Sequence, residues 1–140
     1  MASERTLAII KPDAVAAHNI GNILAIIEGK KFSIKKAEML RLSKQKAEGF
    51  YGIHSDKPFF SNLTDFMSSG PIFVMVLDGE YAIQRWRETM GATNPAEASP
   101  GTVRKLYGTS IERNSTHGSD GPQTAAFEIS YFFPGYKMLE

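Results

Sequence analysis

One histidine, His117, stands among small and polar residues in the segment 114–120, which reads Asn-Ser-Thr-His-Gly-Ser-Asp. A neutral imidazole is a nucleophile near pH 7, and a partner on its second nitrogen can hold it in one tautomer. Small neighbours leave room for a bulky, charged substrate. Taken alone, however, a histidine in such a turn is more often a surface or capping residue, because Gly, Ser and Asp are favoured in turns for backbone reasons. The role of His117 therefore depends on the residues that accompany it.

Three cations are predicted at the ends of elements. Lys11 closes the first strand, Arg87 lies near the end of a helix, and Arg104 lies in a short helix after a long loop. Each of them alone is most simply a surface charge. Together they would neutralise a polyphosphate, arginine through bidentate contacts and lysine as a point charge. The chain has neither a G-x-x-x-x-G-K-[ST] nor a G-x-G-x-x-G motif, so a bound phosphate must be held without a glycine-rich loop.

A helix is predicted directly after the histidine segment, over residues 123–133. Its first turn would present free N–H groups and a positive dipole end, which favour an anion near His117. Glu128 shares a face with Ala125 and Phe132 by helical spacing, so its carboxylate falls beside an apolar stripe and requires a partner. Two interpretations stay open: Glu128 extends to the surface, or it reaches His117 and sets its tautomer.

The elements that must position these residues follow from hydrophobic periodicity and from Gly and Pro stops. Strands are predicted over 6–10, 32–42 and 72–77, and helices over 20–28, 44–54, 62–68, 81–90, 100–107 and 123–133. Ser99-Pro100 is expected to begin the short helix that runs through Tyr107. The unbroken apolar run 72–77 indicates a central strand that is buried on both faces. A fourth strand is expected near 115–117, where the sequence signal is poor.

This order of elements is an α+β pattern. It predicts a ferredoxin-like four-stranded antiparallel sheet covered by helices, which we expect on one face of the sheet. The 140 residues, 42% of them hydrophobic, fit a single domain over 1–140.

Composition excludes several classes of protein. The chain has no cysteine, which excludes disulfides and Cys-type zinc sites. A formal net charge of +1 argues against nucleic acid as a partner. The chain has no apolar stretch near the roughly 20 residues needed to span a bilayer, and its first residues lack a signal-peptide pattern. We therefore expect a cytoplasmic protein with no membrane partner.

Eight sequence blocks occur in order along the chain: Lys11-Pro12-Asp13-Ala14-Val15, Gly49-Phe50-Tyr51, Lys57-Pro58-Phe59-Phe60, Met67-Ser68-Ser69-Gly70-Pro71, Arg85-Trp86-Arg87, Gly91-Ala92-Thr93-Asn94-Pro95, Gly101-Thr102-Val103-Arg104 and the segment 114–120. In these blocks the sequence resembles the nucleoside diphosphate kinase family along essentially its whole length. The chain departs from the family pattern at 17–19 and 121–123, which bears on loop contacts and subunit packing.

The resemblance implies transfer of the γ-phosphoryl group from a nucleoside triphosphate to a nucleoside diphosphate by a ping-pong mechanism. His117 would be the nucleophile, phosphorylated at its pros nitrogen, Nδ1, and Ser119 and Glu128 would support it. The residues implied to bind the nucleotide are Lys11, Tyr51, Arg87, Thr93 and Arg104 at the phosphates, Lys11 and Asn114 at the sugar, and Phe59, Leu63 and Ile111 at the base. Lys11 and Tyr51 would also act in the transfer itself.

The resemblance also implies Mg²⁺ bound to the nucleotide phosphates, with no direct protein ligand. The partners would be nucleoside tri- and diphosphates such as ATP and GTP. Stacking on Phe59 tolerates any base, since every base has a π-face, so broad base specificity is expected. The protein would be a homo-oligomer, a tetramer or hexamer built from dimers.

Three other functions compete with this interpretation. The chain could be a catalytically silent relative, although the presence of Lys11, Arg104 and His117 argues against it. A nucleic-acid-binding role conflicts with the near-neutral charge. Phosphatase or mutase chemistry would ordinarily need a second catalytic histidine, and neither His18 nor His54 has a supporting motif.

Overall fold

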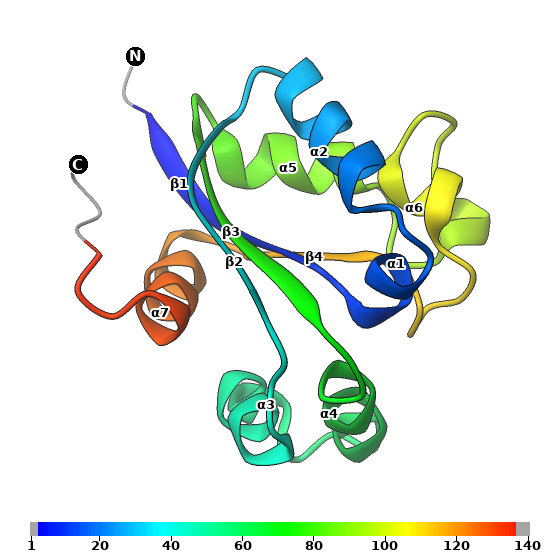
Figure 1. The fold of residues 1–140 in the computed structure, drawn as a ribbon, viewed down its shortest axis with the longest axis vertical. Coiled ribbons are helices and arrows are strands. Elements are labelled where there is room, and N and C mark those ends of the chain that lie inside the picture. The colour runs from blue at the N-terminus through cyan, green and yellow to red at the C-terminus, as the bar shows by residue number, and fades with distance from the viewer. Residues whose placement is uncertain (1–2, 137–140) are drawn as a thin grey trace.

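The computed structural model describes residues 3–136. Its four strands form one sheet in the order β2-β3-β1-β4, and all neighbouring strands are antiparallel (Figure 1). The strands are β1 (Glu4–Ile10), β2 (Ser33–Leu40), β3 (Ile72–Gly79) and β4 (Thr116–Gly118). The α-helices of the described residues are α1 (Pro12–Ala16), α2 (Ile20–Gly29), α3 (Lys44–Phe50), α4 (Phe60–Met67), α5 (Ala82–Met90), α6 (Val103–Tyr107) and α7 (Pro122–Phe132). The predicted ferredoxin-like α+β sheet is confirmed.

Helices cover both faces of this sheet (Figure 1). Along β1, Leu7 and Ile9 belong to a core with residues of α3, α4 and α7, whereas Ala8 and Ile10 belong to a second core with residues of α1, α2, α5 and α6. The alternation follows from the two-residue period of a strand. Our expectation of helices on one face was wrong, because the hairpin α3–α4 between β2 and β3, together with α7, closes the second face. The apolar run of β3 had indicated this double burial correctly.

Several helix boundaries differ from the prediction. Pro12 opens the short helix α1, which the pattern did not predict, and proline is well tolerated at the first helical position. Helix α3 begins after the cap Ser43, as predicted, but ends at Phe50, and residues 52–54 form a 3₁₀ turn. Helix α6 is capped by the hydroxyl of Thr102, not by Ser99. Gly101, with φ +87°, interrupts any helix that would start earlier.

Strand β4 lies where the fourth strand was expected, at the edge of the sheet, and pairs His117 with Ile9. Paired residues on neighbouring strands point to the same face, so His117 points with Ile9 toward α3, α4 and α7. Its neighbour Gly118 points to the other face, where an added Cβ would lie 2.5 Å from Cδ1 of Trp86. Trp86 therefore requires a glycine at this position. No helix in the described part of the chain is long and apolar enough to cross a membrane.

Candidate active site

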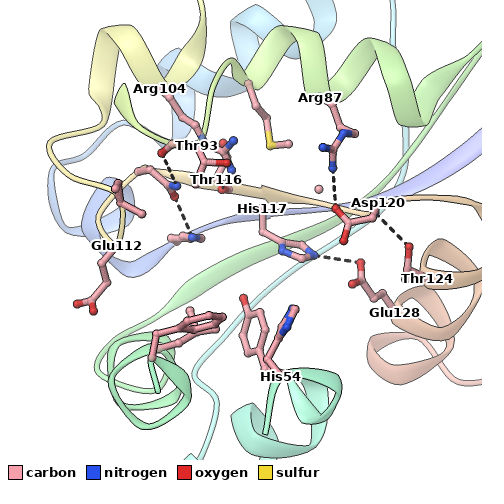
Figure 2. A pocket seen from close by; sticks show the side chains of 18 of the residues that line it. His54, Arg87, Thr93, Arg104, Glu112, Thr116, His117, Asp120, Thr124 and Glu128 are labelled. Carbon is pink, nitrogen blue, oxygen red and sulfur yellow. Dashed lines mark hydrogen bonds and ion pairs between the residues drawn. The ribbon is translucent and has the colours of Figure 1, made fainter. Parts of the chain in front are cut away.

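A cavity of about 730 Å³ opens between the end of β1, the α3–α4 hairpin, the loops before β4, and the start of α7 (Figure 2). It is lined by every predicted site residue except Ser119: Lys11, Tyr51, Phe59, Leu63, Arg87, Thr93, Arg104, Ile111, Asn114, His117 and Glu128. Ser119 is fully buried and contacts the cavity-lining residue Glu128. Residues that are more than a hundred positions apart in the chain thus meet in one pocket.

His117 is held by a carboxylate (Figure 2). Its Nε2 lies 3.0 Å from Oε1 of Glu128, and the Ser119 hydroxyl donates to the same oxygen at 2.8 Å. Ser119 in turn accepts the backbone N–H of Leu7 at 3.2 Å, which ties this network to β1. Of the two interpretations of Glu128, the structure supports the one in which it reaches His117. An ionised carboxylate only accepts hydrogen bonds, so Nε2 carries the hydrogen and Nδ1 keeps its lone pair.

Aromatic rings restrict the imidazole further. The ring of Phe50 lies 5.3 Å from that of His117, and the ring of Tyr51 lies 6.0 Å from it, both in edge-on arrangements. The Tyr51 hydroxyl is buried without a hydrogen-bond partner among the described residues. Burial, and then the charge of Glu128, raise the pKa of Tyr51, so its hydroxyl stays protonated. It is a donor available to an anion bound in the cavity.

Lys11, which directly follows β1, also lines the cavity. Its Nζ donates to Oδ1 of Asn114 at 2.8 Å, and the Asn114 amide nitrogen donates to the carbonyl of Thr93 at 3.0 Å. Burial, and then repulsion by Arg104, lower the pKa of Lys11 from 10.5 to about 8. The ammonium is thus a desolvated cation, which a bound anion would stabilise.

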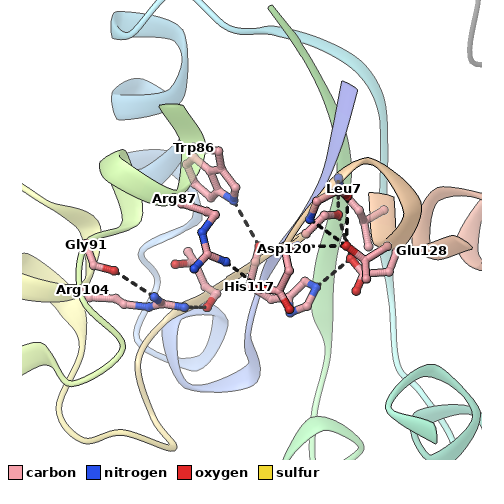
Figure 3. Close-up of polar contacts among 12 residues, drawn as sticks. Leu7, Trp86, Arg87, Gly91, Arg104, His117, Asp120 and Glu128 are labelled. Atoms are coloured by element: carbon pink, nitrogen blue, oxygen red, sulfur yellow. Dashed lines mark hydrogen bonds and ion pairs between the residues drawn. The ribbon is translucent and has the colours of Figure 1, made fainter. Parts of the chain in front are cut away.

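The two arginines differ in how firmly they are held (Figure 3). Arg104 is buried and donates to the carbonyls of Gly91 at 2.9 Å and Thr116 at 2.8 Å. Burial, and then the charge of Arg87, lower its pKa to about 10, so it remains charged at neutral pH. Arg87 pairs with Asp120 at 2.6 Å, and both of these side chains are exposed. A polyanion in the cavity would meet one fixed guanidinium and one that can turn toward it.

The mouth of the cavity is apolar. Phe59 is 48% exposed and Ile111 is 61% exposed, and both line the opening together with Leu63. Large hydrophobic side chains left in water at a cavity mouth indicate a site that binds an apolar ligand group.

The sequence analysis gave no role to several residues that line the cavity or support its wall. His54, which lacks any supporting motif, points into the same cavity as His117, with its ring 5.7 Å from that of Phe59 (Figure 2). Asp120, the partner of Arg87, stood within the histidine segment but had no assigned role. Trp86 lies outside the cavity lining and donates from Nε1 to the His117 carbonyl at 3.2 Å (Figure 3). No local sequence pattern predicts this contact, because it depends on how α5 packs against β4.

The comparisons with known proteins agree with this geometry. The family model described as nucleoside diphosphate kinase matches residues 4–138. The chain belongs to the nucleoside diphosphate kinase family. It is 57% identical over 136 residues to a nucleoside diphosphate kinase of Syntrophotalea carbinolica, covering 97% of this chain and 99% of the relative. A relative of the same name from Nitratidesulfovibrio vulgaris is also 57% identical, over 97% of this chain and 98% of its own length.

Solved structures of the family share the fold. The nucleoside diphosphate kinase of Aquifex aeolicus superposes with a TM-score of 0.94 at 44% identity, covering 96% of this chain and 97% of that one. The enzyme of Halobacterium salinarum, solved in complex with CDP, superposes with a TM-score of 0.91 at 38% identity, covering 95% of this chain and 89% of that one. The chain is therefore an enzyme, a phosphotransferase that acts between nucleoside tri- and diphosphates.

Proposed function

We propose that this enzyme transfers the γ-phosphoryl group from a nucleoside triphosphate to a nucleoside diphosphate by a ping-pong mechanism through a phosphohistidine at Nδ1 of His117. The observation that carries the proposal is the 3.0 Å contact between Nε2 and Glu128. It leaves Nδ1 as the nitrogen with a lone pair, in a cavity that Lys11, Arg87 and Arg104 also line. An unprotonated Nδ1 can attack the phosphorus in line, and the nearby cations would stabilise the negative charge of the phosphoryl group.

In the first half-reaction, Nδ1 attacks the γ-phosphorus, the bond to the β,γ-bridging oxygen breaks, and the nucleoside diphosphate leaves. The imidazole then carries positive charge, and Glu128 stabilises it through Nε2–H, with Ser119 holding the carboxylate in place. The second half-reaction is the reverse, with a different diphosphate as the acceptor. One pocket serves both halves, because donor and acceptor differ by only the phosphoryl group that moves.

The cavity divides into parts that suit the parts of a nucleotide. Lys11, Arg104, Arg87, Thr93 and the Tyr51 hydroxyl would contact the phosphates, and Lys11 with Asn114 would hold the sugar hydroxyls. Phe59, with Leu63 and Ile111, would contact the base. The apolar character of this mouth supports broad base specificity, since stacking does not read the edges of a base.

Magnesium is expected to enter with the nucleotide. No cluster of three His, Cys, Asp or Glu side chains that could hold a metal lies within residues 3–136. Three carboxylates line the cavity: Glu128 and Asp120 are engaged by His117 and Arg87 respectively, and the third, Glu112, is exposed. A Mg²⁺ ion held by the phosphates fits this donor set, and it would neutralise charge on the transferred group.

We further propose that residues 1–140 form one domain, which acts in the cytoplasm as a homo-oligomer, either a tetramer or a hexamer built from dimers. Strand β2 supports an interface, because it lies at the edge of the sheet and Met39 on it is 51% exposed. Native mass spectrometry would count the subunits.

The test is transfer of label from γ-³²P-labelled ATP to the protein, quenched in alkali because phosphohistidine is labile in acid. The wild-type protein should take up label and lose it on addition of unlabelled GDP, and His117→Asn should take up none. His54→Asn is the matched control, since this histidine lines the same cavity, and it should still be labelled. Label on His117→Asn, or a wild-type protein that transfers phosphate without ever being labelled, would refute the proposal.

A further inference from the structure

Ser115, two residues before His117, has a backbone conformation that residues other than glycine rarely adopt. Its φ is +76°, and the N–H of Thr116 donates to the carbonyl of Asn114 at 2.9 Å. A hydrogen bond between residues two apart, around a central residue with φ near +75°, defines a strained form of the γ-turn. Ser115 is fully buried. Such a conformation persists only where its surroundings impose it.

The surroundings that impose it come from the other end of the chain. The Ser115 N–H donates to Oδ2 of Asp13 at 3.1 Å, and the Ser115 carbonyl accepts the backbone N–H of Lys11 at 2.8 Å. Both peptide groups that flank the Ser115 Cα atom are therefore bonded to the segment directly after β1. One of these bonds is a backbone bond, and the other requires the carboxylate of Asp13.

The γ-turn determines how two halves of the site face each other. On one side of it, Asn114 bonds Lys11 and the Thr93 carbonyl. On the other side, the Thr116 carbonyl accepts from Arg104, and His117 follows. A relaxed, extended Ser115 would reverse the direction in which the chain leaves Asn114. The separation between the Asn114 amide and the His117 imidazole therefore depends on the turn.

We propose that Asp13 is a positioning residue for phosphoryl transfer: its carboxylate holds Ser115 in the γ-turn, so that Asn114 and His117 engage the same nucleotide. This inference rests on the function proposed above. Asp13 acts through the backbone of Ser115 and does not contact the phosphoryl group. Burial raises the pKa of Asp13, and the charge of Lys11 and the Ser115 N–H oppose that rise without cancelling it.

The test exploits the fact that glycine adopts positive φ without steric strain. Asp13→Ala removes the acceptor, and the rate of His117 phosphorylation should fall on the order of tenfold to a hundredfold, the effect of a misplacement of about 1 Å. Adding Ser115→Gly to Asp13→Ala should recover most of that rate, because the turn then no longer needs to be imposed. Asp13→Asn keeps an oxygen acceptor in a side chain of the same size. Its rate of His117 phosphorylation should stay within about threefold of the wild-type rate, a much smaller change than a misplacement of about 1 Å would cause.

Two further variants separate positioning from stability. Ile27→Val shortens a buried side chain of α2, away from the cavity, and should lower stability without changing the rate of phosphorylation. If Asp13→Ala does not fold, Asp13→Glu displaces the carboxylate by one methylene group and should show the same loss and the same rescue by Ser115→Gly.

The outcomes are distinguishable. A wild-type protein that is never phosphorylated would overturn the proposed function and this inference with it. With a phosphorylated wild type, the positioning role alone is overturned by any of three results: an unchanged rate in Asp13→Ala, no rescue by Ser115→Gly, or a loss in Asp13→Asn as large as in Asp13→Ala. The last result would mean that the negative charge of Asp13, and not its hydrogen bond to the Ser115 N–H, supports the rate of phosphorylation.

Discussion

Replacing Lys11 with methionine should change how stability depends on pH. Lys11 is 7% exposed, and its pKa falls from 10.5 to about 8, chiefly because burial disfavours the ammonium. At about 1.36 kcal/mol for each pH unit, the folded state carries a penalty of roughly 3 kcal/mol for the charged form. Lys11→Met removes that penalty together with the hydrogen bond to Asn114.

The sign of the effect follows from proton binding. Between about pH 8 and pH 10.5 the folded protein has released the Lys11 proton while the unfolded chain still holds it. The unfolded state then binds more protons, so the free energy of unfolding of the wild type rises with pH. The variant lacks this contribution. The difference, wild type minus Lys11→Met, should therefore increase by about 2 kcal/mol from about pH 6.5 to about pH 9.5.

Urea unfolding at a single protein concentration measures this difference, with the fluorescence of Trp86, the sole tryptophan, as the signal. The lost bond to Asn114 lowers the stability of the variant by about 1–3 kcal/mol at every pH, so the informative quantity is the change with pH. Lys35→Met removes an exposed lysine from β2 and is the matched control. A wild-type minus Lys11→Met difference that is flat or falls with pH would refute the argument from burial.

Three further variants test other parts of the site. Glu128→Gln should slow phosphorylation of His117 on the order of a hundredfold, because a neutral amide stabilises the developing imidazolium poorly; rapid quench in alkali measures it, and an unchanged rate contradicts the role. Trp86→Phe should lower the free energy of unfolding by about 1–3 kcal/mol through the lost donor to the His117 carbonyl, which urea titration would detect or exclude. Asp120→Asn should change stability by less than about 1 kcal/mol, because its pair with Arg87 is exposed; a larger loss on thermal or urea unfolding would show that the pair is structural.

Local patterns predicted the parts of this molecule that local physics decides. The apolar run of β3 indicated a strand buried on both faces, and Pro12 placed Lys11 at the end of β1. Ser43 was recognised as a cap because a side-chain oxygen can satisfy a free N–H at the start of a helix. The same reasoning failed at Ser99-Pro100, since Thr102 is an equally good cap and Gly101 separates the two.

Local patterns did not predict which face of the sheet each helix covers. Each helix has one apolar face, and nothing in its periodicity tells which side of the sheet that face will cover. The hairpin α3–α4 and helix α7 therefore closed a face that we expected to be open. That closure matters for the site, because it surrounds His117 with Phe50 and Tyr51.

The order of residues along the chain establishes which chemical groups are available: one histidine among small residues, a carboxylate on the helix that follows it, and cations at the ends of elements. These depend on residue type and on spacing of a few positions. Which of these groups come into contact depends on how the whole chain folds. The pairing of Ile9 with His117 and the bond from Ser115 to Asp13 join positions about a hundred residues apart. Such contacts form when the sheet assembles and buries both partners. The sequence of either segment alone therefore does not predict them.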